Sequence, residues 1–310
     1  MLKNIKYSIV IPLYNKAEHI KRAIDSVLSQ TINNYELIIV NDGSSDGGEN
    51  HVKKYNDSRI KLINQKNQGV SVARNKGILE SKGNYIAFLD ADDEWLPDFL
   101  ETVNLLINTY PTASAYSTSY YYITPEYKKE IKYFKSLPTQ PWEGILPSYF
   151  KVSYRNGSPM WTSTTCIKRD VFEDIGMFKA EMRLAEDIDL WVRVALNYKI
   201  AFTTDCKGIY HTESDNRTPT VAGAPKIDPH FVTLLQEELD NNELPKELRE
   251  DVEKFIATYL ISFSQLNMDA GDYNQAKKFL FDKRCSKFFK LQIKYIFLYY
   301  FKYFINLIKK

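Results

Sequence analysis

The sequence has few cysteines and contains no long hydrophobic run. Its three cysteines, Cys166, Cys206 and Cys285, are odd in number and far apart. This argues against a disulfide framework or a zinc site and is typical of a reducing compartment. No stretch is apolar for long enough to cross a bilayer. The short apolar run at residues 7–13 contains Pro12 and does not have the form of a signal peptide. We therefore expect a cytoplasmic protein.

Over most of the chain, neither basic nor acidic residues are in excess. There are 41 basic and 39 acidic residues, a net charge of +2, which argues against nucleic-acid binding. The exception is the C-terminus, where no acid occurs from Lys287 onward and lysines alternate with aromatic residues. A basic, aromatic, amphipathic helix of this kind is typical of an anionic membrane surface. The alternative is a helix packed on the protein with its lysines in water.

The length and composition are those of a folded protein with one large domain or two smaller ones. The chain has 310 residues, of which 44% are hydrophobic and 26% charged. Its character changes near Val221, where Ala222–Pro225 has the composition of a linker or lid and helical patterns follow. We expect a catalytic domain over residues 1–220 and a helical extension over residues 221–310.

Short apolar runs alternate with helical patterns in the first ninety residues. The runs at 7–12, 35–40, 60–63 and 85–89 predict strands, and helices are expected near 15–28, 46–55 and 70–79. Such alternation predicts an α/β fold with a mostly parallel sheet and helices on both faces. Later strands are expected at 113–124, 161–167 and 200–203, with an irregular region at 125–159 and a helix at 186–196.

Polar clusters follow each of the first four predicted strands. They are Tyr14-Asn15, Asn41–Ser44, Asn67–Gly69 and Asp90–Asp92. Each cluster alone is compatible with a turn. Because the carboxyl ends of parallel strands meet at one edge of a sheet, all four should lie together where open α/β sheets bind ligands.

The acidic cluster 90–93 carries the most specific chemistry. Two carboxylates held close together repel each other unless a cation lies between them. Mg²⁺ prefers one or two carboxylates together with phosphate oxygens, so Asp90 and Asp92 predict a metal–diphosphate site. The alternative is an acidic turn in which Asp92 or Asp93 caps the helix after Pro97.

Five stretches in order resemble the motifs of inverting family-2 glycosyltransferases. They are residues 9–15 (IVIPLYN), 40–46 (VNDGSSD), 69–75 (GVSVARN), 88–93 (FLDADD) and 186–191 (EDIDLW), and the resemblance extends over about residues 5–217. It implies a GT-A-like, Rossmann-type fold, a nucleotide-diphospho-sugar donor, usually with uridine, and Mn²⁺ or Mg²⁺ as cofactor.

Site residues are implied by the same resemblance. The donor nucleotide would be bound by Pro12, Tyr14, Asn15, Asp42, Arg74, Asp90 and Ala91. Within this set, Asp42 would accept hydrogen bonds from the base and Asp90 would bind the ribose. Asp92 would hold the metal, and His211 matches a position that touches the metal or diphosphate in some relatives. The motif usually has an acid where this sequence has Asn41.

Asp187 is implied as the general base. Glycosyl transfer with inversion needs a carboxylate that takes the proton of the acceptor hydroxyl. A position on the first turn of a helix should keep Asp187 ionised, although acids there can also be ordinary caps. Trp161 and Trp191 could contact the acceptor or pack in the core, and His211 could be solvated rather than a ligand.

Three other functions agree less well with the sequence than a transferase does. A dehalogenase-like phosphatase would not have Glu94 at the position it occupies after the Asp-x-Asp pair. A nucleotidyltransferase would need glycines after the first strand, and a degenerate scaffold subunit would have no need of the acids. We expect a hexosyl- or N-acetylhexosaminyl-transferase of surface polysaccharide assembly. It would use a glycan or lipid-linked acceptor and lie on the inner face of the cell membrane, with an oligomer possible.

Overall fold

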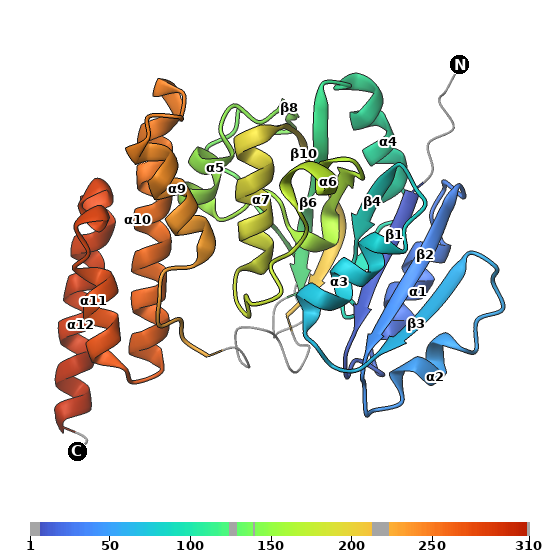
Figure 1. Ribbon diagram of the computed structural model, residues 1–310, viewed down its shortest axis with the longest axis horizontal. Coiled ribbons are helices and arrows are strands. Elements are labelled where there is room, and N and C mark those ends of the chain that lie inside the picture. The colour runs from blue at the N-terminus through green and yellow to red at the C-terminus, as the bar shows by residue number, and fades with distance from the viewer. Residues whose placement is uncertain (1–6, 124–128, 139, 213–222, 309–310) are drawn as a thin grey trace. The chain divides into compact units, whose positions relative to one another are not determined.

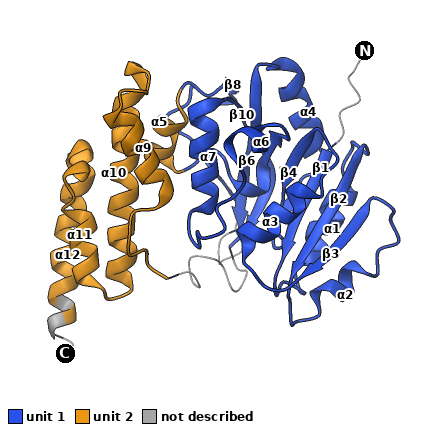
Figure 2. Cartoon of the chain, viewed as in Figure 1, with its two compact units in different colours: residues 1–147, 158–215 blue, residues 148–157, 216–310 orange. Residues whose placement is uncertain are grey.

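The computed structural model describes residues 7–123, 129–138, 140–212 and 223–308. The chain divides into two compact units, one of residues 1–147 and 158–215 and one of residues 148–157 and 216–310 (Figure 2). The expected boundary after residue 220 and the first residue of the expected linker, Ala222, lie outside the described residues. Residues 148–157 were expected in the catalytic domain, but they group with the second unit.

The first half of unit 1 alternates strands and helices as predicted. In chain order it contains β1 (Tyr7–Leu13), α1 (Ile20–Leu28), β2 (Tyr35–Asp42), α2 (Gly48–Val52), β3 (Ile60–Gln65), α3 (Val70–Leu79) and β4 (Tyr85–Phe88). One boundary differs from the prediction, because α1 begins at Ile20 rather than near Asn15. Turns occupy the intervening residues and fix the loop that follows β1.

The second half of unit 1 is less regular than predicted. It contains β5 (Glu94–Trp95), α4 (Phe99–Thr109), β6 (Ala113–Ile123), β7 (Lys129–Ile131), β8 (Glu143–Ile145), η1 (Thr162–Thr164), β9 (Thr165–Lys168), α6 (Val171–Ile175), α7 (Glu186–Asn197) and β10 (Lys199–His211). The expected strand at 161–167 is a 3-10 turn followed by β9. The strand expected at 200–203 continues to His211 through register shifts near Cys206.

One ten-stranded sheet organises unit 1 (Figure 1). Its order is β3-β2-β1-β4-β9-β6-β10-β5, with β7 paired to β6 and β8 to β10. The pairs within β3-β2-β1-β4 are parallel, and β9 is antiparallel to both β4 and β6. Since β10 is parallel to β6, six strands run in one direction. The predicted mostly parallel α/β sheet is therefore confirmed.

Close packing of α3 on β1 depends on Gly77. Val10 is fully buried in β1, and a Cβ atom added to Gly77 would lie 2.3 Å from the Cγ1 atom of Val10. The absence of a side chain at Gly77 lets the helix approach the strand closely. This approach fixes the position of Arg74, which lies one turn earlier on α3.

Unit 2 is helical, as expected for the C-terminal region. It contains α5 (Tyr149–Asn156), α9 (His230–Asp240), α10 (Lys246–Asp269), α11 (Tyr273–Leu280), η2 (Lys283–Phe288) and α12 (Phe289–Ile308). Its core centres on Phe255, whose ring contacts those of Phe150, Phe231 and Tyr259. Among the described residues, no helix combines the length and hydropathy of a bilayer-spanning segment.

Candidate functional site

The loops after β1 and β2 meet at the carboxyl edge of the sheet. Asn15 adopts a left-handed backbone with φ of 50°. Its backbone N–H donates to the Oγ atom of Ser44 at 3.1 Å, and its side-chain oxygen accepts the N–H of Ser45 at 2.8 Å. Tyr14 is 48% exposed beside this connection, whereas Pro12 is buried within β1. The two predicted polar clusters therefore form one continuous surface.

Asp42 joins this surface to the loop between β3 and α3. One carboxylate oxygen accepts hydrogen bonds from the Gln65 side chain at 2.7 Å and the Gln68 backbone at 2.9 Å. The other accepts the Gly69 N–H at 2.8 Å. A carboxylate offers about four acceptor positions, so one position remains on the oxygen bound by Gly69. Asp42 shapes the loop and can accept one further donor, although only 2% of its surface is exposed.

Asn41 uses its amide within the protein. Its nitrogen donates to the Asn64 side chain at 2.9 Å, and its oxygen accepts the Ser44 N–H at 3.1 Å. An acid would lose the first of these bonds because it has no N–H to donate. Asparagine at this position therefore stabilises the edge of the sheet, and the remaining acceptor position for a ligand is on Asp42.

The acidic stretch after β4 forms a tight turn. The backbone N–H of Asp93 bonds the carbonyl of Asp90 at 3.1 Å, and Ala91 between them is buried. Strand β5 follows before α4 begins, and the residue preceding α4 is Asp98. Asp92 and Asp93 therefore do not cap this helix, and the alternative of a simple capping turn is wrong.

Arg74 links this turn to α7. Its guanidinium donates to the Asp90 carboxylate at 2.7 Å and to the Glu186 carboxylate at 2.9 Å. Arg74 is only 4% exposed. Burial opposes its charge, but Asp90 and Glu186 outweigh this effect and raise its pKa above the usual value. The two elements that carry the predicted donor and base residues are thereby joined by one cation.

Asp187 is half-buried beside Glu186 on the first turn of α7. It accepts a hydrogen bond from the Thr162 hydroxyl at 3.3 Å and one from the Ile188 N–H at 2.8 Å. Burial and then the charge of Glu186 raise its pKa to about 6. The first turn of a helix was expected to keep Asp187 ionised. Burial and a like charge oppose this, but with a pKa of about 6 the carboxylate is still mostly ionised at neutral pH. A carboxylate with this pKa is well matched to proton abstraction near neutral pH.

Ser163 is a positioning residue that the sequence analysis did not identify. Its hydroxyl accepts the Asp90 N–H at 3.1 Å and donates to the Asp93 carboxylate. Asp93 is buried, and this burial together with Asp92 and Asp90 raises its pKa well above the usual value. The hydroxyl-rich run 162–165 was the available signal, but the contact spans some seventy residues of chain.

His211 lies at the end of β10, close to the acidic turn. Its Nε2 atom is 3.2 Å from a Glu94 carboxylate oxygen, and its backbone N–H bonds Asp93. The hydrogen bond between Glu94 and the His211 side chain lowers the pKa of Glu94. The structure therefore links His211 to the acidic turn through Glu94 and Asp93.

The acidic turn is suited to a divalent cation that takes its remaining ligands from a diphosphate. Among the described residues, no three or more His, Cys, Asp and Glu side chains are grouped to hold a metal. Asp92 already pairs with a cation, since its carboxylate is 2.8 Å from the Lys16 ammonium. Mg²⁺ and related ions commonly bind through one or two carboxylates plus phosphate oxygens, which is the donor set that Asp92 offers together with a diphosphate.

The two candidate tryptophans differ in accessibility. Trp161 is partly exposed, and its ring lies 4.4 Å from that of Tyr120 and 5.3 Å from that of Tyr210. Trp191 is fully buried against Phe178. A direct acceptor contact by Trp191 is therefore wrong, because its ring reaches no surface. Contact by Trp161 stays a prediction.

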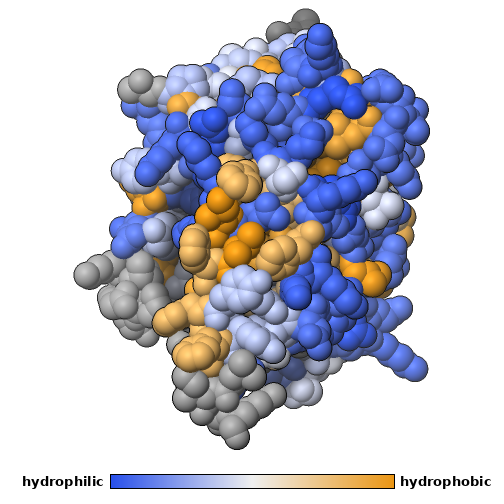
Figure 3. Space-filling view, turned by 90° about the vertical axis from the view of Figure 1, so that its left-hand side faces the viewer, coloured by the Kyte–Doolittle hydropathy of each residue, from blue (hydrophilic) through white to orange (hydrophobic). Residues whose placement is uncertain are grey.

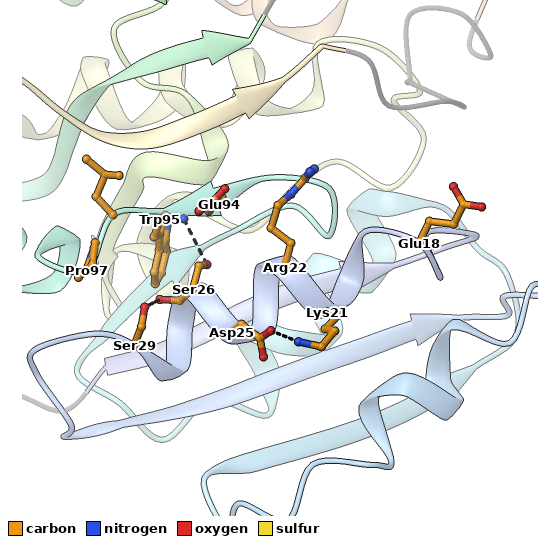
Figure 4. A pocket seen from close by; sticks show the side chains of 10 residues that line it. Glu18, Lys21, Arg22, Asp25, Ser26, Ser29, Glu94, Trp95 and Pro97 are labelled. Atoms are coloured by element: carbon orange, nitrogen blue, oxygen red, sulfur yellow. Dashed lines mark hydrogen bonds and ion pairs between the residues drawn. The ribbon is translucent and has the colours of Figure 1, made fainter. Parts of the chain in front are cut away.

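A cavity of about 590 Å³ lies along α1, and neither Asp42 nor Asp187 is among its lining residues (Figure 4). It is lined by Glu18, Lys21, Arg22, Asp25, Ser26, Ser29 and residues 94–97. The Arg22 guanidinium donates to the backbone carbonyl of Asp92. The cavity therefore lies behind the acidic turn and does not include Asp187 or Asp42.

Known proteins share both sequence and fold with this chain. Glycosyltransferase GlyA of Streptococcus pneumoniae serotype 4 is 37% identical over 122 residues, which are 39% of this chain and 18% of that protein. An uncharacterized glycosyltransferase of Rickettsia felis is 30% identical over 227 residues, 72% of this chain and 36% of that protein. The chain thus matches a minor part of the length of each of these two relatives.

Two solved structures have the same fold at low identity. S. aureus TarS 1-349 in complex with UDP-GlcNAc has a TM-score of 0.67 and 19% identity, covering 89% of this chain and 81% of that one. A mannosyltransferase from Pyrobaculum calidifontis in complex with GDP-Man and Mn²⁺ has a TM-score of 0.60 and 16% identity, covering 88% and 73%. These likenesses confirm the predicted GT-A-like fold.

A family model decides the classification. The model described as glycosyl transferase family 2 matches residues 8–176, more than half of the chain. The match includes the joined loops after β1 and β2, the acidic turn and Ser163, and ends before the helix of Asp187. By its sequence and by its fold, the chain belongs to glycosyl transferase family 2.

Proposed function

We propose that this protein is an inverting glycosyltransferase that moves a sugar from a nucleotide-diphosphate donor, in the first place a UDP-sugar, to a hydroxyl of an acceptor. The observation that carries the proposal is the joining of the acidic turn and Asp187 by Arg74, which contacts Asp90 at 2.7 Å and Glu186 at 2.9 Å. This contact supports a base on α7 next to a donor site at the edge of the sheet. Neighbours of the same fold carry UDP-GlcNAc or GDP-Man, which supports a nucleotide sugar as donor.

Different side chains at this edge of the sheet have different roles in the reaction. Tyr14, Asn15 and Asp42 bind the nucleoside, with the remaining acceptor position on Asp42 for an N–H of the base. Asp187 takes the proton of the acceptor hydroxyl as its oxygen forms a bond to the anomeric carbon. The bond from that carbon to the diphosphate oxygen breaks in the same displacement, and the nucleoside diphosphate leaves. One base is sufficient because inversion needs no covalent intermediate.

Charge on the leaving diphosphate has to be neutralised. A divalent cation supplies this stabilisation without proton transfer. Asp92 would hold it, and His211 is held at the same turn by its contact with Glu94. The mannosyltransferase neighbour contains Mn²⁺, which supports Mn²⁺ or Mg²⁺ as the cofactor here.

Calorimetry with UDP tests the proposal. The wild-type protein is titrated with UDP in the presence and absence of Mn²⁺, and Asp92→Ala is titrated in the same way. We expect binding that requires Mn²⁺ in the wild type and is lost in the variant. If neither UDP nor any other nucleoside diphosphate binds, the donor site is not functional. A scaffold subunit then becomes the better reading.

The outer face of α12 supports a location at the inner face of the cell membrane. Phe297, Phe301 and Phe304 are 74%, 64% and 64% exposed, and at spacings of four and three residues they share one side of the helix. Lys290 and Lys294 continue the same side and are also exposed. Figure 3 shows hydrophobic residues gathered, with paler residues among them, on the face that carries α11 and α12.

The inner face of α12 is occupied by its own unit. Tyr299 is buried against Tyr273, and Tyr295 donates a hydrogen bond to Gln265 at 2.8 Å. These contacts therefore do not use the exposed aromatic face of α12. Aromatic rings beside lysines suit an anionic bilayer surface, and an enzyme there would meet lipid-linked acceptors. This supports a role in assembling a surface polysaccharide or glycan.

A further inference from the structure

Lys16 forms an ion pair with the Asp92 carboxylate at the acidic turn. Its ammonium lies 2.8 Å from one Asp92 carboxylate oxygen, and both side chains are largely shielded, with 12% and 15% exposed. An ion pair this protected from solvent is not a typical surface pair. It lies at the carboxylate that the acidic turn would offer to a divalent cation.

The backbone around Lys16 is held rigidly. Asn15 before it is fixed in a left-handed conformation by Ser44 and Ser45. The carbonyl of Lys16 accepts the N–H groups of His19 and Ile20 at 3.0 and 2.9 Å. The N–H of Ala17 donates to Asp46 at 2.7 Å. The root of the side chain is therefore fixed, while its four-carbon stem can move the ammonium.

We propose that Lys16 is a diphosphate-binding residue whose ammonium moves between the Asp92 carboxylate and the diphosphate of the donor. In the unliganded protein it neutralises Asp92. With a divalent cation held by Asp92, the Lys16 ammonium would leave this carboxylate and contact the diphosphate of the donor. The inference rests on the proposed function, since it assumes a nucleoside-diphosphate donor at this edge.

The physical reason is electrostatic. The Lys16 ammonium would compete with a divalent cation for the Asp92 carboxylate, because two cations beside one carboxylate repel each other. The displaced ammonium remains on a fixed backbone next to the arriving diphosphate. Lysine binds phosphate as a mobile point charge, so no rearrangement of the loop is required. Arg22 holds the backbone carbonyl of Asp92 and can keep the turn in place while the pair separates.

The exchange predicts opposite effects on two ligands. For Lys16→Met we expect Mn²⁺ alone to bind about threefold or more tightly, because the competing ammonium is gone. UDP at saturating Mn²⁺ should bind about tenfold or more weakly, the size of one charge-assisted hydrogen bond. Uridine, which lacks the diphosphate, should bind as it does to the wild type. Lys16→Arg should keep most of the UDP affinity, since the charge is retained.

Three measurements test this on the chain of 310 residues. Mn²⁺ binding is followed by the electron paramagnetic resonance signal of the free ion, UDP binding by calorimetry, and uridine binding by ligand-observed NMR. Lys21→Met is the matched control, because Lys21 on α1 also pairs with an aspartate, Asp25, but both are exposed. The control should leave all three affinities unchanged.

The outcomes separate the exchange from the donor class. An unchanged UDP affinity in Lys16→Met, or an Mn²⁺ affinity that does not rise, overturns the exchange. Equal losses for UDP and uridine also overturn it, since they indicate a damaged nucleoside site. If the wild type does not bind UDP, the proposed donor fails, and the Mn²⁺ comparison still decides whether Lys16 competes for Asp92.

Discussion

Glu186 and Asp187 are consecutive residues on one helical turn, but only the first is neutralised. Glu186 accepts a 2.9 Å hydrogen bond from Arg74, whereas Asp187 accepts bonds only from neutral groups in the contacts described above. The negative charge of Glu186 and burial raise the pKa of Asp187 to about 6. The structure thus stabilises one carboxylate and leaves its neighbour basic enough to accept a proton.

Replacing Asp187 with Asn should abolish sugar transfer without loss of donor binding. General-base catalysis contributes about 10²–10⁴-fold to rate, so we expect a fall in kcat of that size. UDP affinity measured by calorimetry should stay within about twofold, because Asn has the shape of Asp and removes no donor contact. Asp205→Asn, at an exposed aspartate of the same unit, is the control. Transfer at the wild-type rate by Asp187→Asn would show that the base is elsewhere.

The same substitution should stabilise the protein at neutral pH. A raised pKa in the folded state means that stability falls as pH rises from about 4 to about 6, since the folded state holds the proton more tightly than the unfolded state. Asp187→Asn removes this loss, and we expect a gain of about 1–2 kcal/mol at pH 7. Urea unfolding at pH 7 and at pH 4 checks the sign. A gain that is the same at both pH values would contradict the link to Asp187.

Transfer should depend on pH through Asp187. The ionised form is the active one, so kcat should rise through a midpoint near pH 6 and level off above it. Glu186→Gln removes a negative charge that raises this pKa and also leaves Arg74 less neutralised. Both effects should move the midpoint to lower pH. A pH–rate profile of each protein measures the shift, and a midpoint that rises in Glu186→Gln would contradict the proposed electrostatics.

Removing Arg74 should destabilise the fold strongly. Arg74→Met leaves the buried Glu186 carboxylate and the Asp90 carboxylate without their cation, and we expect a loss of about 3 kcal/mol. Lys61→Met, which breaks an exposed pair with Glu80, is the matched control and should cost less than about 1 kcal/mol. Urea unfolding at pH 8 measures both. Equal losses in the two variants would mean that burial does not distinguish these pairs.

Much of the fold could be predicted because its first half alternates local signals. The strands from β1 to β4 are short apolar runs separated by helical periodicity, and parallel pairing places their polar ends together. The short strands β5, β7 and β8 were missed because two or three residues carry no periodicity of their own. β5 and β8 pair with β10, far away in the chain, and β7 pairs with the neighbouring strand β6.

The close contact of α3 with β1 gives a stability test. Gly77→Ala introduces a Cβ atom 2.3 Å from Val10, so it should destabilise by about 1–3 kcal/mol despite the better helix propensity of Ala. Adding Val10→Ala makes room, and the double variant should be about 1 kcal/mol or more stable than additivity predicts. Denaturant unfolding of the four proteins closes the cycle. Additive losses would mean that the two residues do not compete for space.

The exposed face of α12 predicts binding to anionic vesicles. Replacing Phe297 and Phe304 with Ser should abolish co-flotation with vesicles containing phosphatidylglycerol. The reason is that the aromatic area that would enter the bilayer surface is lost. Leu105→Ser is the control, since Leu105 is also an exposed hydrophobic residue, 57% accessible, but lies on α4. Vesicles of phosphatidylcholine alone should bind less protein. If the double variant still floats, or if it converts a dimer into a monomer, the face serves another partner.

The candidate site was predictable in its residue types and less so in its contacts. Asp42, Asp90, Asp92 and Asp187 were expected from their motifs. The sequence analysis missed Ser163, because its bonds to Asp90 and Asp93 span about seventy residues. The raised pKa of Asp187 could not be predicted either, because its main cause is how deeply the fold buries this carboxylate.

The direction of β9 constrains how this protein can change. Because β9 runs against β4 and β6, the chain enters the sheet at the carboxyl edge instead of leaving it there. The hydroxyls of Thr162 and Ser163 therefore precede their strand, and the register of β9 sets their height relative to Asp187 and Asp90. Inserting or deleting one residue between Ser163 and Thr165 would displace both hydroxyls along the edge. In this stretch, chain length has to be kept as strictly as residue type.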